Sequence, residues 1–157
     1  MEDRIDSVVN SVEVNLSIEK AFEKFTKEFN SWWPKEYTWS QQKLEKIELG
    51  LESGARCTEF GPDGFVIDWG KVIEWNPSTY LAIRWQIGAT REPQPDPEKS
   101  SLVEVQFKSL GSEKARVTLE HKKFENHGEG AAEYRDNMAS EFGWPYVLAQ
   151  YQNTVNA

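Results

Sequence analysis

The chain has 157 residues, of which 13% are aromatic, and a formal net charge of −8. A chain of this length is most simply one domain, residues 1–157, and buries about 70% of the surface that its unfolded form exposes. The acidic balance argues against binding to nucleic acid or to anionic membrane surfaces. Its apolar runs fall far short of the ~20 residues that span a bilayer, and the start after Met1 is unlike a signal sequence. With Cys57 as its only cysteine, the chain is expected to be cytoplasmic.

The first part of the chain predicts a strand followed by a helix and a helical turn. Apolar residues at even positions predict a strand over residues 7–16. Ser17 has the character of a helix N-cap, and apolar residues at helical spacing predict a helix over residues 18–26 that could continue to Phe29. Pro34 ends this region, because the residue before a proline avoids the helical conformation.

The middle of the chain predicts a meander of antiparallel strands. Alternating apolar residues place these strands at about residues 47–51, 55–60, 65–75, 80–87, 103–107 and 115–121. In the third of them, the residues expected on the inner face are Phe65, Ile67, Trp69, Ile73 and Trp75. Residues 88–101 contain three prolines and no apolar periodicity, so we expect a long loop that is either mobile or functional.

The end of the chain predicts one more short helix, between residues 128 and 140, and then a long amphipathic one. The second helix begins near Trp144, after the break at Gly143, and runs for about three turns. Pro145 fits the first turn of a helix. The apolar stripe of this helix consists of Trp144, Val147, Leu148, Tyr151 and Val155. Strands and helices thus occur in blocks, which indicates an α+β fold with the last helix packed on a curved sheet.

Several segments resemble a known group of proteins. The first strand followed by residues 17–22 resembles the opening of the START-like, helix-grip superfamily. Residues 70–77 followed by residues 80–85 are similar to the central strand pair of one branch, named after the activator of the heat-shock-protein-90 ATPase (the AHSA type). Residues 117–121 and the Gly-Trp start of residues 143–148 resemble the closing segment of that branch.

This resemblance covers nearly the whole chain and implies a fold rather than an activity. The implied fold is the helix-grip: a curved antiparallel sheet of about six to seven strands, wrapped around a long C-terminal helix, with two short helices after the first strand. It also implies a hydrophobic cavity between the sheet and that helix. Members of the superfamily include ligand carriers, cyclases, hydrolase-like proteins and co-chaperone domains, so the resemblance does not choose among these functions.

Aromatic residues and one histidine supply the candidate site. His121 is in phase with Val117 and Leu119, so its side chain is expected on the apolar face of the sheet. It would act as a polar anchor or acid–base group in a pocket, or it is a core histidine bonded to the backbone, a Tyr or a Trp. The residues expected to line the cavity are Phe25, Trp32, Trp33, Phe65, Trp69, Trp85, Phe107, His121, Trp144, Leu148 and Tyr151. Whether these rings line a hollow or fill it stays open at this point.

Other chemistry finds little support in the sequence. His121 and His127 are six residues apart, Cys57 is distant, and neither C-x-x-C nor H-E-x-x-H occurs, so we expect no metal and no cofactor. Asp68 and Glu74 are expected on the outer face of the sheet, in solvent.

The sequence therefore favours binding of a small hydrophobic or aromatic molecule in a cavity between the sheet and the C-terminal helix, with no catalytic residue assigned. Two alternatives remain: a protein-interaction module of the co-chaperone type, and a small-molecule enzyme that uses His121. The expected partner is a small hydrophobic molecule, with no nucleic acid and no membrane, and a homodimer is left open.

Overall fold

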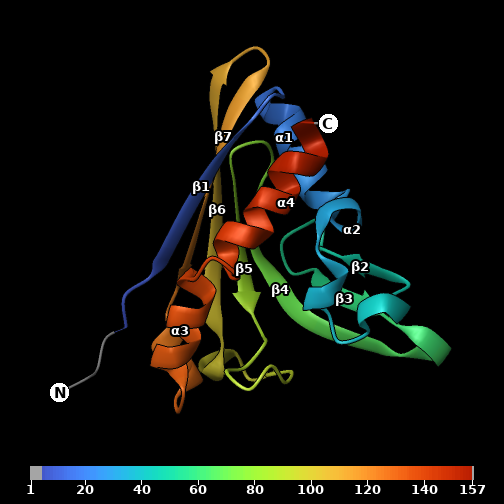
Figure 1. Ribbon diagram of the computed structural model, residues 1–157, viewed down its shortest axis with the longest axis vertical. Helices are drawn as coiled ribbons and strands as arrows, with labels where there is room; N and C mark the ends of the chain where they lie inside the picture. The colour runs from blue at the N-terminus through green and yellow to red at the C-terminus, as the bar shows by residue number, and fades with distance from the viewer. Residues whose placement is uncertain (1–4, 157) are drawn as a thin grey trace.

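A seven-stranded antiparallel sheet forms the framework of the protein, seen in a computed structural model that describes residues 5–156 (Figure 1). The strands are Val8–Val14 (β1), Lys46–Glu48 (β2), Arg56–Phe60 (β3), Val66–Asn76 (β4), Tyr80–Trp85 (β5), Ser101–Gly111 (β6) and Lys114–Lys122 (β7). Their spatial order is β1-β7-β6-β5-β4-β3-β2. Strands β2 to β7 are therefore neighbours in chain order, and the predicted meander is confirmed.

The helices complete an α+β helix-grip fold, as the sequence predicts. The α-helices are Ile18–Thr26 (α1), Phe29–Trp32 (α2), Ala131–Ala139 (α3) and Trp144–Asn156 (α4). Single 3-10 turns lie at Lys35–Tyr37 (η1), Gln41–Lys43 (η2), Pro62–Gly64 (η3), Pro97–Lys99 (η4) and Phe124–His127 (η5). Ser17 caps α1, because its hydroxyl accepts a hydrogen bond from the Lys20 amide at 3.3 Å.

The C-terminal helix α4 crosses the inner face of the sheet (Figure 1). Its buried residues, Trp144, Val147, Leu148 and Tyr151, are four of those in the predicted apolar stripe. The Tyr151 hydroxyl donates a hydrogen bond to the Ala21 carbonyl at 2.7 Å. This bond joins α4 to α1, so both helices close over the same face of the sheet.

Strand β4 departs from the predicted alternation at two β-bulges. Its register with β3 skips Trp69, and its register with β5 skips Ile73. Each bulge exchanges the two faces of the strand, so Val72, which alternation placed outside, is fully buried. Phe65 was expected inside, but it precedes the strand and is 40% exposed, so that assignment is wrong.

Aromatic rings fill the space between the centre of the sheet and α4. The ring of Phe25 packs against those of Trp32, Phe107 and Tyr151 at centroid distances of 4.9, 5.6 and 5.2 Å. The hollow that remains in this interior is about 10 Å³, which is room for one water molecule at most. The aromatic residues thus form a packed core here, and a larger cavity has to lie elsewhere.

None of the helices described for residues 5–156 is both long and apolar enough to cross a membrane.

Gly70 allows β4 to lie close against β5 beside the bulge at Trp69. A Cβ atom at this position would lie 2.8 Å from the backbone oxygen of Arg84. We expect Gly70→Ala to lower the free energy of unfolding by about 1–3 kcal/mol, because the backbone has to shift to admit the methyl group. Urea unfolding followed by Trp fluorescence measures this loss. Gly111→Ala is the matched control, since a Cβ there would have no heavy atom within 4 Å, and an equal loss in both variants would contradict the prediction.

Candidate functional site

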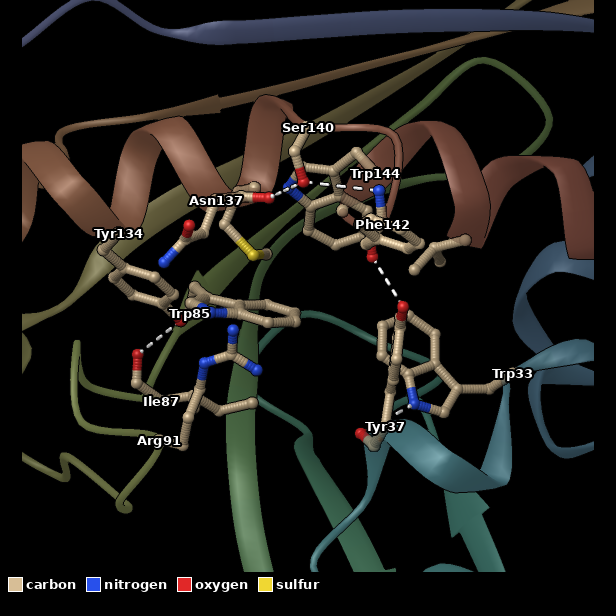
Figure 2. A pocket seen from close by; sticks show the side chains of 13 residues that line it. Trp33, Tyr37, Trp85, Ile87, Arg91, Tyr134, Asn137, Ser140, Phe142 and Trp144 are labelled. Carbon is tan, nitrogen blue, oxygen red and sulfur yellow. Dashed lines mark hydrogen bonds between the residues drawn. The ribbon is translucent and has the colours of Figure 1, made fainter.

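An open pocket lies where α3 and α4 meet, at one end of the filled interior (Figure 2). Its volume is about 380 Å³, within the range of roughly 300–1,000 Å³ that is usual for small-molecule sites. The lining residues come from three separate segments, within residues 33–37, 85–91 and 134–147, and are Trp33, Tyr37, Trp85, Ile87, Arg91, Tyr134, Asn137, Met138, Ser140, Phe142, Gly143, Trp144 and Val147. The pocket therefore depends on how these segments meet.

A bend between α3 and α4 makes room for the pocket. The Gly143 amide donates a hydrogen bond to the Ser140 carbonyl at 2.9 Å, which closes the turn between the two helices. A Cβ atom on Gly143 would lie 2.2 Å from the Met138 carbonyl oxygen, so a larger residue would push the two helices apart. In Figure 1, α3 is turned away from the line of α4, and the pocket occupies the angle between them.

Three indoles form the inner wall of the pocket. The ring centroids of Trp85 and Trp144 are 5.3 Å apart, and Trp33 lies 6.4 Å from Trp85 and 6.2 Å from Trp144. Trp33 in turn stacks on Phe29 at 5.0 Å, with an interplanar angle of 20°. The wall is therefore the outer surface of the aromatic core, which gives it a rigid backing.

Tyr134 fixes the Trp85 indole in this wall. The indole Nε1 donates a hydrogen bond to the Tyr134 hydroxyl at 2.8 Å, and that hydroxyl donates to the Ile87 carbonyl at 3.0 Å (Figure 2). Burial raises the pKa of Tyr134 to about 12, so the hydroxyl keeps its proton at neutral pH. These two bonds attach α3 to the end of β5.

Two hydrogen bonds join opposite rims of the pocket region. The Tyr37 hydroxyl donates to the Phe142 carbonyl at 2.6 Å (Figure 2), and the Tyr146 hydroxyl donates to the Glu36 carboxylate at 2.7 Å. The bond from Tyr146 lowers the pKa of Glu36, which keeps this carboxyl ionised. The Phe142 side chain is 70% exposed at this rim. The segment containing η1 is thereby held against the start of α4.

A chain of three polar side chains lies behind Trp144. The indole Nε1 of Trp144 donates to Nδ1 of His121 at 3.0 Å, and Nε2 of His121 lies 2.7 Å from the Ser101 hydroxyl oxygen. That oxygen lies 2.7 Å from Nε2 of His127. Because an indole can only donate, Nδ1 of His121 must accept and its Nε2 carries the proton. The Ser101 hydroxyl therefore accepts from His121, and its own proton is available for Nε2 of His127.

Both histidines of this chain are held in the neutral form. Burial lowers the pKa of His121 well below its usual value, and the nearby His127 lowers it further. Burial also lowers the pKa of His127. Within the described part of the chain, Nδ1 of His127 has no hydrogen-bond partner.

The structure divides the predicted cavity residues into distinct groups. Trp33, Trp85 and Trp144 line the open pocket. Others belong to the filled interior, where each is buried: Phe25, Trp32, Trp69, Phe107, Leu148 and Tyr151. His121 is also fully buried and lies behind Trp144 instead of in the pocket. Phe65 is exposed and lies apart from the pocket lining.

Sequence reasoning missed most of the remaining lining, including Tyr37, Tyr134 and Asn137. These residues sit on short segments whose apolar pattern is weak. One signal was present in residues 88–101, for which the sequence predicts a long loop that is either mobile or functional. This loop folds back through a bridge between Pro93 and Ile87, and it contributes Arg91 to the pocket. Ile87, which the sequence places at the end of the preceding strand, also lines the pocket.

The carboxylates and thiol of the interior serve the fold. The carboxylate of Glu59 is buried and accepts hydrogen bonds from the Trp39 amide at 3.1 Å and from the Ser40 amide at 2.8 Å. Burial raises the pKa of the Cys57 thiol to about 12. Among residues 5–156, no group of three or more His, Cys, Asp or Glu side chains is arranged to hold a metal ion.

A curled antiparallel sheet closed over a C-terminal helix places the protein in the START-like, helix-grip class. Within that class, the chain belongs to the family described as Activator of Hsp90 ATPase homolog 1-like protein, whose family model matches residues 15–156. The resemblance drawn from the sequence is therefore confirmed. No protein among the curated sequences matches the chain.

Solved structures of this class include two with substantial sequence identity. An anthrahydroquino-gamma-pyrone synthase, Txn09, is 32% identical over 99% of this chain and 100% of its own, with a TM-score of 0.69. The self-sacrificing resistance protein CalC from Micromonospora echinospora is 28% identical over 95% of this chain and 93% of its own, with a TM-score of 0.65. The Aha1 dimer from Colwellia psychrerythraea, 14% identical over 97% of each chain with a TM-score of 0.63, shares the fold.

The two neutral histidines make the stability of the protein depend on pH. Because their pKa values are lowered in the folded state, the unfolded chain takes up protons first as the pH falls. The full stability is present above about pH 6.5 and is lost progressively below it. We expect the free energy of unfolding to fall by about 1–2 kcal/mol between pH 7.5 and 5.5, measured by urea unfolding.

His121→Gln is the informative variant for this pH dependence. A Gln side chain can accept from Trp144 and donate to Ser101, as the imidazole does, but it does not titrate. The variant should lose less stability than the unsubstituted protein over the same pH range. The same loss in both proteins would show that His121 is not the group that titrates.

Proposed function

We propose that the protein binds a flat aromatic small molecule in the pocket between α3, α4 and the end of β5. The observation that carries this proposal is the wall of three contacting indoles, Trp33, Trp85 and Trp144, on a pocket of about 380 Å³. Offset and edge-to-face aromatic contacts contribute about 0.5–1.5 kcal/mol each beyond the burial of apolar area. Asn137 and Ser140 add the small number of polar groups that usually orient a ligand.

One of the two more similar solved structures supports the same class of ligand. One is a synthase named for an anthrahydroquino-gamma-pyrone, and the other is named as a resistance protein. The first name denotes fused, flat rings, and a pocket walled by indoles suits such a shape. We carry over this ligand class alone.

The proposal assigns binding and orientation to the pocket, and no catalytic residue. The enzyme alternative relied on His121, whose ring nitrogens are both engaged by Trp144 and Ser101 in the buried chain behind the wall. The pocket lining itself offers aromatic rings, a guanidinium, an amide and hydroxyl groups. These groups are suited to stacking on a ligand and to hydrogen bonding with it.

A contiguous apolar patch on the surface would favour the alternative of a protein-interaction module. Among the described residues, several of the exposed large apolar side chains lie on different elements, such as Val9 on β1, Leu110 on β6 and Phe142 before α4, whereas Phe65 and Val66 are consecutive. The homodimer left open by the sequence is a separate question, which sedimentation velocity at several protein concentrations answers.

Isothermal titration calorimetry with two flat probes, anthraquinone-2-carboxamide and anthraquinone-2-carboxylate, tests the proposed pocket. We expect saturable binding of at least one probe. Met138→Trp should weaken that binding about tenfold or more, because the larger side chain occupies the pocket, and tenfold corresponds to about 1.4 kcal/mol.

Met138→Leu is the matched control, since it keeps the volume and apolar character of the side chain. It should bind as the unsubstituted protein does. The absence of saturable binding for both probes, or binding that Met138→Trp leaves intact, would refute the proposed site.

A further inference from the structure

The pocket carries a positive charge in an acidic protein. Among the lining residues in the described part of the chain, Arg91 is the one with a charged side chain. The chain as a whole has a formal net charge of −8. An acidic protein thus has a cation, and no carboxylate, in the lining of its main aromatic pocket.

The backbone of Arg91 is held in place at the edge of the pocket. Its amide donates to the Gly88 carbonyl at 2.9 Å, and its carbonyl accepts a hydrogen bond from the Trp39 indole at 2.8 Å. Its φ angle of 68° lies in the left-handed region, which costs a residue other than glycine about 1–2 kcal/mol. Since the surrounding contacts maintain this conformation, the side chain starts from a fixed point.

The guanidinium of Arg91 is free to bind a ligand. Figure 2 shows the side chain extending from its loop towards Trp85, on the pocket side. Within residues 5–156, the guanidinium makes none of the ion pairs or side-chain hydrogen bonds of the structure. Its five N–H donors are therefore available, in a planar arrangement that matches a carboxylate.

The positive charge of Arg91 acts on two tyrosines that line the pocket. Burial raises the pKa of Tyr37 and of Tyr134, the Glu36 carboxylate raises the pKa of Tyr37 further, and the positive charge of Arg91 opposes the rise at both hydroxyls. Arg91 and both tyrosines line the same pocket. The guanidinium would therefore also act on a ligand held in that pocket.

We propose that the ligand of this pocket is a flat aromatic anion, whose rings contact the Trp33–Trp85–Trp144 wall and whose acidic group is bound by Arg91. This inference rests on the proposed function and adds the charge of the ligand to it. A hydrogen bond to a charged group contributes more than one between neutral groups, so Arg91 selects acids over neutral molecules of the same shape.

The two anthraquinone probes differ in charge and hardly in shape, so their ratio of affinities tests the inference. At pH 7.5 and low salt, anthraquinone-2-carboxylate should bind about three- to tenfold more tightly than anthraquinone-2-carboxamide, because Arg91 is exposed and solvent screens its charge. Arg91→Gln should remove this preference by weakening the carboxylate alone. Arg91→Lys should keep part of it, because it retains the charge but loses the planar fork.

Arg84→Gln is the matched control, because it removes one positive charge from a β5 residue that does not line the pocket. It should leave the preference unchanged. Equal binding of both probes to the unsubstituted protein would overturn the anion inference and leave the proposed aromatic site standing. A preference that survives in Arg91→Gln would overturn the role of Arg91, and binding of neither probe would refute the site itself.

Discussion

The burial of indole N–H groups is the constraint on which this structure depends. A buried donor without a partner costs about 1–3 kcal/mol, and each Trp brings one such donor into an apolar interior. Trp32 donates to a carbonyl of α1, Trp85 to a hydroxyl of α3, and Trp144 to an imidazole of β7. The bonds of Trp85 and Trp144 connect helices to strands that are distant in the sequence, and the bond of Trp32 joins the consecutive helices α1 and α2. Trp69, at a bulge of β4, is the exception, since its Nε1 has no partner within the described residues.

The same bonds explain why the interior is filled at its centre and open at one end. At the centre, rings such as Phe25 and Tyr151 contact each other across the space between the sheet and α4. At the end, Tyr134 and His121 hold two indoles at the edge of this core, while the bend at Gly143 moves α3 away from them. The pocket is therefore the surface of the core left uncovered by a bent helix, and its wall is as rigid as the core behind it.

Most of the fold can be predicted from the sequence, but only a minority of the site residues can, for a physical reason. The helix α4 is predictable because the spacing from Trp144 to Tyr151 depends on one segment alone. The exposure of Phe65 and the bulge at Trp69 are not predictable in this way, because the register is a property of two paired strands. The approach of Arg91 to Tyr134 depends on segments that are far apart in the sequence and meet only in the folded chain. Whether aromatic rings fill or line a hollow depends on sheet curvature, which no local pattern specifies.

The construction of the pocket has a consequence for how proteins of this kind can diversify. Its wall belongs to the core and is costly to change, whereas Arg91, Tyr37 and Phe142 lie on connecting segments. Substitutions or length changes in those connections would alter the charge, depth and entrance of the pocket without disturbing any strand register. Stability and ligand choice are thus encoded in largely separate parts of the chain, so one can vary while the other is retained.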